Sequence, residues 1–318
     1  MSARKVLISD PLSARAVATL KAAPGLDVAE VKGLSEEALL PLVADVDAWI
    51  VRSATQVTRR LIDAAPKLRW IGRAGAGLDN IDVAAAKEKG IAVLNVPGAN
   101  SVAVAELVFG LLLGLFRRIP DADASMRSGA WEKSRFKGRE LRGKTIGIVG
   151  LGKIGRAVAS RARAFEMTCL AHDPLVADAD VRALGVEPAS LPDLLGRSDV
   201  VTLHVPMSAA TRGMIGAAEI ARLKKGAVLV NAARGGLVDE AALLDALRSG
   251  AIAGAALDVF AEEPPPDRAL VTHPNVVTTP HIGASTVEAQ DAVGDEIVRL
   301  LLEAMAAAEA PGAWRTTR

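Results

Sequence analysis

The chain has 318 residues, a length typical of about two domains; half of the residues are apolar and 24% are charged. This composition is that of a globular protein and excludes an intrinsically disordered chain. The net charge of +1 gives no field that would attract nucleic acid or an anionic membrane, so we expect neither as a partner.

The N-terminal residues MSARKVLISD lack the apolar core of about 7–15 residues that a signal peptide needs. The most apolar stretch, Leu107–Phe116, is too short for a membrane span, which needs about 20 residues. The single cysteine, Cys169, cannot form an intrachain disulfide and is expected within a strand. We therefore expect a soluble, cytoplasmic protein without a metal site.

The first third of the chain alternates short Val- and Ile-rich runs with longer Ala- and Leu-rich stretches, as parallel α/β sheets do. Five strands are expected, at Val6–Ser9, Asp27–Val31, Ala48–Val51, Trp70–Gly72 and Ala92–Asn95. Helices are expected at Ser13–Ala22 and Ser35–Leu42. A long helix should follow from Ser101 to Arg118, capped by Asn100 or Ser101 and ended by Pro120.

A second α/β series follows, and its six strands are the number expected of a complete dinucleotide-binding sheet. They are predicted at Thr145–Val149, Thr168–Ala171, Val200–His204, Ala227–Asn231, Ala253–Leu257 and Val276–Thr278. The last helix, Val287–Ala308, should fray in the Ala-rich tail from Ala306. The two series predict two doubly wound parallel-sheet domains, with a boundary near Pro97–Ser101.

A glycine-rich loop joins the first strand of the second series to the helix predicted at Arg156–Phe165. Gly150, Gly152 and Gly155 form G-x-G-x-x-G, which allows a tight turn, close approach of a pyrophosphate and close helix–strand packing. Asp173 follows the next strand, where a carboxylate binds both ribose hydroxyls and repels a 2′-phosphate. The loop therefore predicts NAD as cofactor, with Lys153 and Ile154 among its contacts.

Three dense polar segments each follow an expected strand, where open α/β sheets bind ligands. They are residues 231–240, 256–264 and 280–286. Together with Val51–Thr55 and Gly72–Asn80, they resemble the signature of the D-isomer-specific 2-hydroxyacid dehydrogenases, and the resemblance runs over essentially the whole chain.

The resemblance implies a catalytic set of His281 as base, Glu263 as its partner and Arg234 as clamp of the substrate carboxylate. The chemistry agrees, because oxidation of a secondary alcohol needs a base near neutral pH, and a carboxylate on the second ring nitrogen fixes the tautomer. A guanidinium holds a carboxylate in two places. Glu262 is the alternative partner, and Glu263 is preferred because it directly precedes Pro264.

The cofactor side is expected to include Ala232 and Gly283. Asp258 would hold the nicotinamide carboxamide or support the base. His204 is expected to have a structural or adenine-side role rather than a catalytic one. The other two histidines, His172 and His273, are expected to lie at the surface.

In this family the cofactor domain is inserted into the substrate domain. The resemblance therefore implies a flavodoxin-like substrate-binding domain of residues 1–98 plus 285–318 and a Rossmann NAD-binding domain of residues 99–284. Crossings near 97–100 and 281–285 would form a hinge for closure around substrate.

Candidate substrate residues follow the strands of the first series. Arg52 and Ser53 are candidates for a phosphate or carboxylate, and Gly75, Ala76 and Gly77 could offer backbone N–H groups. Asn100 could line the same pocket.

The basic segment 131–139 is read either as a solvated loop or as an arm that brings Arg135 across a dimer interface. With the long helix from Ser101, this segment is the candidate surface of a homodimer or homotetramer.

Within the family, the resemblance favours members that oxidise D-3-phosphoglycerate, the first step of serine biosynthesis, without the C-terminal regulatory domains of longer forms. The alternatives are a hydroxypyruvate or glyoxylate reductase, another D-2-hydroxyacid dehydrogenase, or an NAD(H)-sensing corepressor-like binding protein. The sequence leaves open the physiological acid, the direction of the reaction, the effectors and the size of the oligomer.

Overall fold

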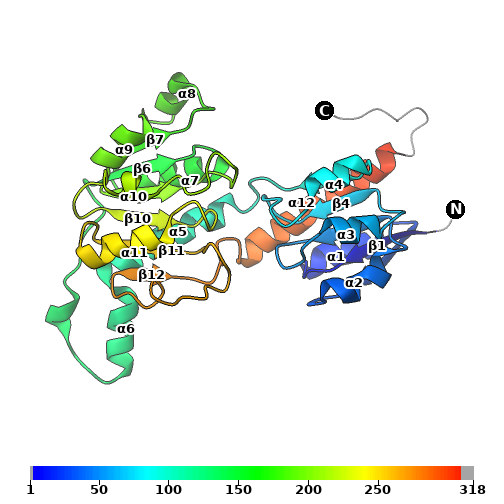
Figure 1. Ribbon diagram of the computed structural model, residues 1–318, viewed down its shortest axis with the longest axis horizontal. Helices are drawn as coiled ribbons and strands as arrows, with labels where there is room; N and C mark the ends of the chain where they lie inside the picture. Colours follow the sequence, from blue (N-terminus) through cyan, green and yellow to red (C-terminus); the bar gives the residue numbers. More distant parts are fainter. Residues whose placement is uncertain (1–2, 309–318) are drawn as a thin grey trace. The chain divides into compact units, whose positions relative to one another are not determined.

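The computed structural model describes residues 3–308 of the chain. By their contacts the residues divide into two compact units: unit 1 comprises Met1–Asn100 and Ser285–Arg318, and unit 2 comprises Ser101–Ala284. The expected fraying of the tail concerns mainly residues 309–318, which lie outside the described residues. Each unit is described by itself (Figure 1).

Unit 1 is built on a five-stranded parallel sheet of order β2-β1-β3-β4-β5, the order of flavodoxin-like folds. The strands are β1 (Arg4–Ile8), β2 (Leu26–Glu30), β3 (Ala48–Val51), β4 (Trp70–Arg73) and β5 (Ala92–Asn95). The helices are α1 (Ala14–Ala22), α2 (Glu36–Val43), α3 (Arg59–Asp63), α4 (Val83–Glu88) and α12 (Val287–Ala307).

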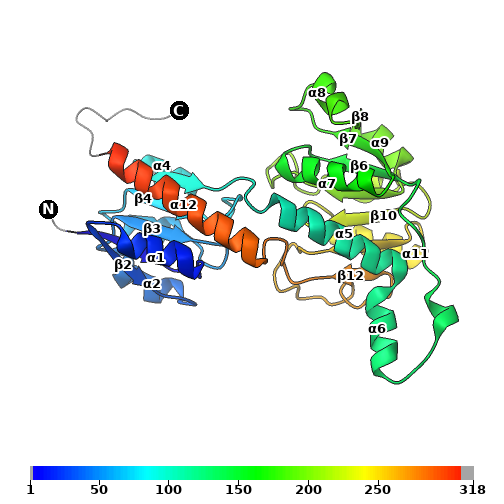
Figure 2. The same cartoon turned by 180° about the vertical axis from the view of Figure 1, so that it is seen from behind.

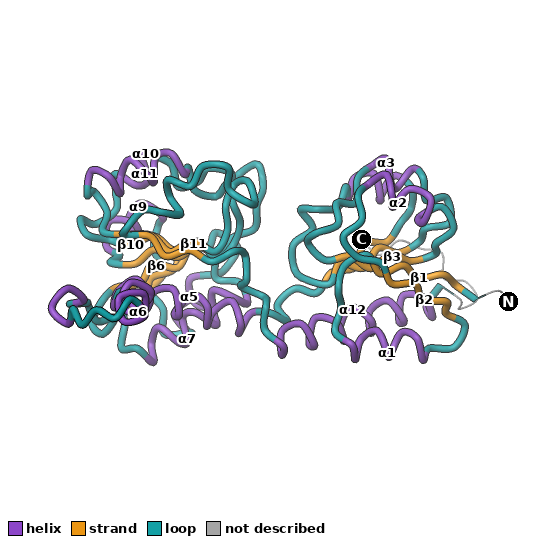
Figure 3. Tube along the Cα trace, turned by 90° about the horizontal axis from the view of Figure 1, so that it is seen from below, coloured by secondary structure: helices purple, strands orange, loops and turns teal. Residues whose placement is uncertain are grey.

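The helices of unit 1 cover both faces of this sheet. Figure 3 shows α1 and α12 on one face and α2 and α3 on the other, where α4 also packs. All four residues of the central strand β3 are consequently buried, which accounts for its unbroken apolar run. Side chains of Ser13, Ser35, Thr58 and Asp82 cap α1, α2, α3 and α4 by accepting a backbone N–H.

Unit 2 contains a seven-stranded parallel sheet of order β12-β11-β10-β9-β6-β7-β8. The strands are β6 (Thr145–Val149), β7 (Thr168–His172), β8 (Glu187–Pro188), β9 (Val200–Leu203), β10 (Val228–Asn231), β11 (Gly254–Leu257) and β12 (Val276–Thr278). The expected sheet of six strands was therefore one short. The missing strand, β8, has two residues and a proline at the sheet edge, a pattern too short to recognise in the sequence.

Helices also cover both faces of the second sheet. They are α5 (Ser101–Arg117), α6 (Ile119–Arg127), α7 (Lys153–Ala164), α8 (Asp178–Ala183), α9 (Leu191–Arg197), α10 (Ala217–Ile220) and α11 (Glu240–Ser249), with a 3-10 turn at Lys133–Phe136. Figure 3 shows α5 and α7 on one face and α9, α10 and α11 on the other. Figure 2 shows α5 in front of the sheet, leading into α6. The fold class of two doubly wound parallel sheets is confirmed.

The long helix α5 differs from expectation at both ends. The buried Oδ1 of Asn100 and Oγ of Ser101 have no hydrogen-bond partner within the described residues, so neither caps the helix. At the other end Arg118 turns left-handed, with φ 52°, and Pro120 lies in the first turn of a further helix, α6. Proline suits a first turn because the N–H it lacks would have no partner there.

Two smaller features concern β7 and the helix after the glycine loop. Cys169 lies buried in β7, as expected, and burial raises the pKa of its thiol to about 11. The helix α7 begins at Lys153, three residues earlier than predicted, so that Gly155 belongs to its first turn.

No helix within residues 3–308 combines the length and apolarity that a bilayer crossing requires.

Candidate active site

The glycine loop of unit 2 has the close contacts that its spacing predicts. Gly150 adopts φ +93°, and a side chain there would come within 2.6 Å of the carbonyl oxygen of His204. A side chain on Gly155 would overlap the Gly150 carbonyl, whereas Gly152 faces open space. Gly152 also precedes α7 without a side-chain cap, so the helix N-terminus is left for another acceptor.

Asp173 follows β7 and lies against this loop. One carboxylate oxygen accepts the backbone N–H of Leu151 at 2.7 Å, and the other accepts that of Leu175 at 2.9 Å. The carboxylate is thereby fixed beside the glycine turn, where Asp173 also lines a cavity of about 350 Å³ with Pro174 and Ser190.

His204 follows β9 and borders the same turn. Its Nε2 lies 3.0 Å from the hydroxyl of Thr202, while its buried Nδ1 has no hydrogen-bond partner among the described residues. Burial lowers the pKa of this imidazole to about 3, so it is neutral at physiological pH. An orphaned ring nitrogen, an uncapped helix N-terminus and the Asp173 carboxylate together fit a dinucleotide with a pyrophosphate and a free ribose diol.

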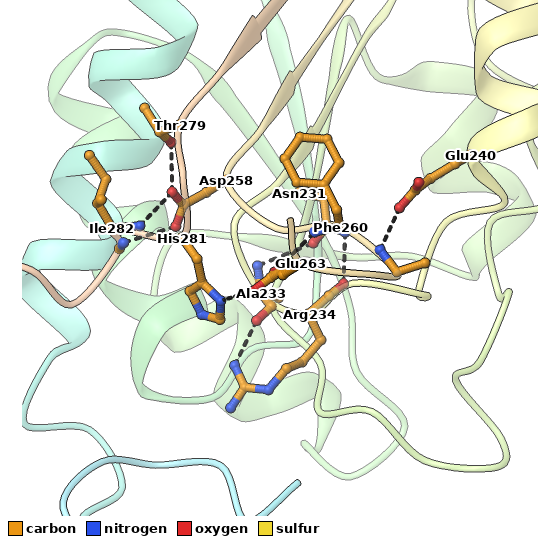
Figure 4. A network of polar contacts seen from close by, with 12 residues as sticks. Asn231, Ala233, Arg234, Glu240, Asp258, Phe260, Glu263, Thr279, His281 and Ile282 are labelled. Atoms are coloured by element: carbon orange, nitrogen blue, oxygen red, sulfur yellow. Dashed lines mark hydrogen bonds and ion pairs between the residues drawn. The ribbon is translucent and has the colours of Figure 1, made fainter. Parts of the chain in front are cut away.

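A histidine–glutamate pair lies past the ends of β11 and β12. The Nδ1 of His281 lies 2.7 Å from Oε2 of Glu263, and the second carboxylate oxygen accepts the backbone N–H of Phe260 at 3.1 Å (Figure 4). The side chains of His281 and Glu263 are 42% and 37% exposed, so the pair is open to a ligand. With Nδ1 engaged by Glu263, the imidazole has Nε2 left for proton transfer.

Arg234 lies in the turn that follows β10. The side chain of Asn231 shapes this turn by donating to the Arg234 carbonyl at 2.8 Å and accepting the N–H of Ala233 at 3.1 Å. Gly235 passes so close to the Phe260 carbonyl that any side chain would overlap it. In Figure 4 the Arg234 guanidinium extends toward the same side as the His281 imidazole, and its Nη1 donates to the Ala233 carbonyl at 2.6 Å.

Asp258, at the end of β11, fastens the turn that carries His281. This 1% exposed residue accepts the Thr279 hydroxyl at 2.6 Å and the backbone N–H groups of Ile282 and Gly283 at 2.8 Å each. The His281 N–H also donates to the Asp258 carbonyl, at 2.8 Å. Of the two roles expected for Asp258, the observed bonds favour support of the base. Ala232 lies buried past β10, near these turns.

In unit 1, Arg52 and Ser53 begin a loop after β3. Arg52 is partly exposed and Ser53 is exposed, and the Arg52 guanidinium donates to the Pro11 carbonyl at 3.3 Å. The neighbouring Gly75 adopts φ +151°, and a side chain there would overlap the guanidinium of Arg73.

The N–H of Gly75, one of the candidate donors to a substrate anion, donates to the Arg73 carbonyl at 2.8 Å. In this structure the donor is therefore used within the tight turn of residues 73–75. The carbonyl of Ala76 accepts the side chain of Asn95 at 2.7 Å, and Gly77 is partly exposed in the same loop.

Arg135 and Asn100 are two further candidate substrate residues. Arg135 is exposed and pairs with Glu132 at 2.8 Å within its own 3-10 turn. Asn100 is the last residue of the first segment of unit 1, and its buried Oδ1 has no hydrogen-bond partner among the described residues.

Sequence reasoning missed the residues that hold the Arg52–Thr55 loop, namely Asp10 and Asn80. Asn80 ends a segment that resembles the family, whereas Asp10 lies outside those segments, and no spacing rule links positions so far apart in the chain. His172, which was expected at the surface, is partly buried, and its Nδ1 lies 3.1 Å from the carbonyl oxygen of Ala189. Within residues 3–308 no group of three or more His, Cys, Asp or Glu side chains could hold a metal ion.

Comparison with known proteins places these features in context. The family model for "D-isomer specific 2-hydroxyacid dehydrogenase, NAD binding domain" matches residues 109–283. A D-3-phosphoglycerate dehydrogenase of Methanocaldococcus jannaschii is 51% identical over 291 residues, which are 91% of this chain and 55% of the relative. The chain thus spans about half the length of the curated relatives it matches.

Solved structures match nearly end to end. The TT0316 protein from Thermus thermophilus is 36% identical with a TM-score of 0.88, covering 96% of this chain and 98% of that one. A glyoxylate reductase from Paecilomyes thermophila is 34% identical with a TM-score of 0.86, covering 96% of each chain.

Proposed function

The chain belongs to the D-isomer specific 2-hydroxyacid dehydrogenases, and from this premise we propose that it oxidises D-3-phosphoglycerate to 3-phosphohydroxypyruvate with NAD. The observation that carries the proposal is the 2.7 Å contact between His281 and Glu263, in a unit that also positions Arg234. The choice of acid is supported by the name of the Methanocaldococcus jannaschii relative, which is 51% identical.

In the proposed reaction His281 is the base. Its Nδ1–H donates to Glu263, so the lone pair on Nε2 accepts the proton of the C2 hydroxyl. The imidazolium formed is stabilised by the Glu263 carboxylate, which faces it directly. The exposed position of the pair lets the proton pass to solvent after turnover.

Arg234 would bind the substrate carboxylate. A guanidinium forms two parallel N–H···O bonds with a carboxylate, which fixes the plane of the group and the orientation of C2 relative to the base. The rigid turn made by Asn231 and Gly235 limits how far Arg234 can drift, so less entropy is lost when the substrate binds.

Bound NAD supplies the hydride acceptor for the hydrogen on C2. The residues proposed to hold it are Gly150, Gly152, Lys153, Ile154, Gly155, Asp173, His204, Ala232 and Gly283. Asp173 would bind the ribose hydroxyls and the N-terminus of α7 the pyrophosphate.

The residues proposed to bind the substrate are Arg52, Ser53, Gly75, Ala76, Gly77 and Asn100. On this reading residues 1–98 plus 285–318 form a substrate-binding domain and residues 99–284 an NAD-binding domain. Arg52 and Ser53 would carry a phosphate or carboxylate of the substrate, since both side chains reach solvent.

A panel of 2-hydroxy and 2-keto acids, with and without a 3-phosphate, tests the proposal by NADH absorbance. We expect D-3-phosphoglycerate to give the highest kcat/KM among the hydroxy acids. Turnover of hydroxypyruvate without phosphate hundreds of times better than of 3-phosphohydroxypyruvate would refute it. That result would favour a hydroxypyruvate or glyoxylate reductase, the second candidate, which the similarity to the glyoxylate reductase supports.

We further propose a homodimer or homotetramer. The segment after α5 bears exposed apolar side chains, Ile119 in α6, Met126 in α6 and Trp131 beyond it, which a partner subunit would cover. Arg135, in the same segment, would then reach substrate bound to the partner. Light scattering on the intact chain and on a Trp131→Ser variant measures this, and a monomeric wild-type protein would contradict it.

A further inference from the structure

The loop Arg52–Thr55 of unit 1 is held from beneath by a buried carboxylate. Asp10, at the end of β1, is 3% exposed, and its Oδ2 accepts the backbone N–H of Arg52 at 2.6 Å and of Thr55 at 3.1 Å. Its Oδ1 accepts the Thr55 hydroxyl at 2.9 Å. Both ends of the four-residue loop are therefore fastened to a single carboxyl group.

Asn80 fastens the same loop through its carbonyl groups. Its side-chain amide donates to the carbonyl of Arg52 at 2.7 Å and to that of Thr55 at 2.6 Å. Asn80 is 9% exposed, so water does not replace these bonds easily. Asp10 and Asn80 thus satisfy the N–H and C=O groups of the first and last loop residues.

A second layer holds the carboxylate side in place. The Ser9 hydroxyl lies 2.9 Å from that of Thr55 and accepts the indole N–H of Trp49 at 2.9 Å. Trp49 is fully buried in β3. The clamp is therefore anchored in the core of the sheet, and only the side chains of Arg52, Ser53 and Ala54 reach the surface.

This arrangement limits how the loop can bind an anion. The N–H groups of Arg52 and Thr55 point at Asp10 and are not available to a substrate. A negative charge directly behind them would also repel an anion that approached the main chain. Binding would then come from the side chains of Arg52 and Ser53 or from the N–H groups of Ser53 and Ala54. The directions of all these groups depend on the backbone that Asp10 and Asn80 hold.

We propose that Asp10 and Asn80 are positioning residues for the substrate anion. They fix the backbone from which Arg52 and Ser53 bind it, and neither touches the substrate. This inference rests on the proposed function only in taking the Arg52–Ser53 loop as a substrate loop. It requires no particular acid.

Three variants test the clamp. Asp10→Ala removes all three acceptor bonds, whereas Asp10→Asn can keep them, because its oxygen still faces the two N–H groups and its amide can donate to the Thr55 hydroxyl. Thr55→Val removes two bonds at constant shape, those of its hydroxyl with Asp10 and with Ser9. Its matched control is Thr58→Val, whose hydroxyl also contacts a carboxylate, that of Glu36 at 2.8 Å, but at the cap of α3 outside the loop.

The acid with the highest wild-type kcat/KM in the panel is used as substrate, so the test stands even if that acid is not D-3-phosphoglycerate. We expect its KM to rise about tenfold or more in Asp10→Ala and about fivefold in Thr55→Val, with kcat within about twofold and the KM for NAD unchanged. Asp10→Asn should restore most of the affinity, and Thr58→Val should lower Tm without changing KM.

Other outcomes overturn the inference. One is a fall in Tm in all variants with the substrate KM unchanged, which would make the clamp purely structural. Another is an equal change in Thr55→Val and Thr58→Val. If Asp10→Ala does not fold, the comparison of Thr55→Val with Thr58→Val decides by itself. Absence of D-3-phosphoglycerate turnover in the wild-type protein would refute the proposed function and leave the clamp to be judged on the acid that is turned over.

Discussion

Unit 1 and unit 2 fasten a loop in the same way, with a buried aspartate at the end of a parallel strand. Asp10 and Asp258 each accept two backbone N–H groups and one threonine hydroxyl, from Thr55 and Thr279 respectively. Both residues are at most 3% exposed. A carboxylate suits this position because it offers several acceptor sites at once to donors that burial would otherwise leave unpaired.

The loops differ in what they present. The loop of unit 2 presents His281, in a left-handed conformation with φ 54° and paired with Glu263. The loop of unit 1 presents Arg52, a fixed positive charge. All four histidines of the sequence lie in unit 2. The same fastening thus positions the imidazole proposed as the base in one unit and a guanidinium, which keeps its charge, in the other.

Replacement of His281 should have the largest effect. His281→Ala removes the proposed base, and we expect kcat to fall by roughly 10²–10⁴-fold with NAD binding nearly unchanged. Stopped-flow turnover and fluorescence titration with NADH measure the two quantities. Full activity of this variant would remove His281 from the mechanism and with it the contrast between the two loops.

Removal of the unit 2 fastening should chiefly affect stability. Asp258→Ala leaves buried N–H groups without acceptors, so the free energy of unfolding should fall by about 2–4 kcal/mol. Glu240→Ala is the control, since Glu240 also accepts a backbone N–H, that of Ala261 at 2.6 Å, but at an exposed site. Urea denaturation measures both, and equal losses would deny that burial gives Asp258 its importance.

Replacement of Glu263 and of its neighbour Glu262 tests which glutamate is the partner of the base. Glu263→Gln keeps a hydrogen-bond acceptor for His281 but loses the charge that stabilises the imidazolium, so kcat should fall about tenfold or more. Glu262→Gln changes the same charge one residue away and should leave kcat within about twofold. Steady-state kinetics at saturating substrate compares them, and the reverse order would reassign the pair.

Replacement of Asp173 tests the proposed cofactor site of unit 2. Asp173→Ala removes the carboxylate proposed to bind the ribose diol, and we expect the Kd for NAD to rise about tenfold and the preference over NADP to shrink. Titration with both dinucleotides measures this. A wild-type protein that prefers NADP would show that Asp173 has been misread.

The smallest effect concerns acid stability, through His204 of unit 2. Burial lowers its folded pKa to about 3, whereas the unfolded chain protonates near 6.5. Its contribution is fully present above pH 6.5 and is lost as the pH falls toward 3, because only the unfolded state then binds the proton. His204→Asn should flatten this part of the stability profile relative to His273→Asn. If the urea midpoints of the two variants change identically between pH 6.5 and pH 3, the argument is contradicted.

Much of this molecule follows from local sequence. The strand pattern predicted both sheets, since fully buried parallel strands such as β3 and β9 read as apolar runs. The Gly150 loop with Asp173 predicted a dinucleotide site through its spacing. Gly155 is required by the nearby Gly150 carbonyl, whereas Gly150 is required by the carbonyl of His204, which is distant in the chain. The ends of α5 and the two-residue strand β8 were missed, because left-handed turns and short edge strands leave little periodic signal.

The sequence by itself determined the fold class and the cofactor loop, because strand periodicity and glycine spacing are local properties. The choice of His281, Glu263 and Arg234 as the catalytic set came from the family resemblance and is a proposal. Only the tertiary structure decided that Asp258 fastens the His281 turn and that Asp10 and Asn80 clamp the Arg52 loop. The bond between Asp258 and Gly283 joins residues 25 positions apart, and that between Asp10 and Arg52 joins residues 42 positions apart. Hydrogen-bond partners at such separations are set by which strands lie side by side in the sheet.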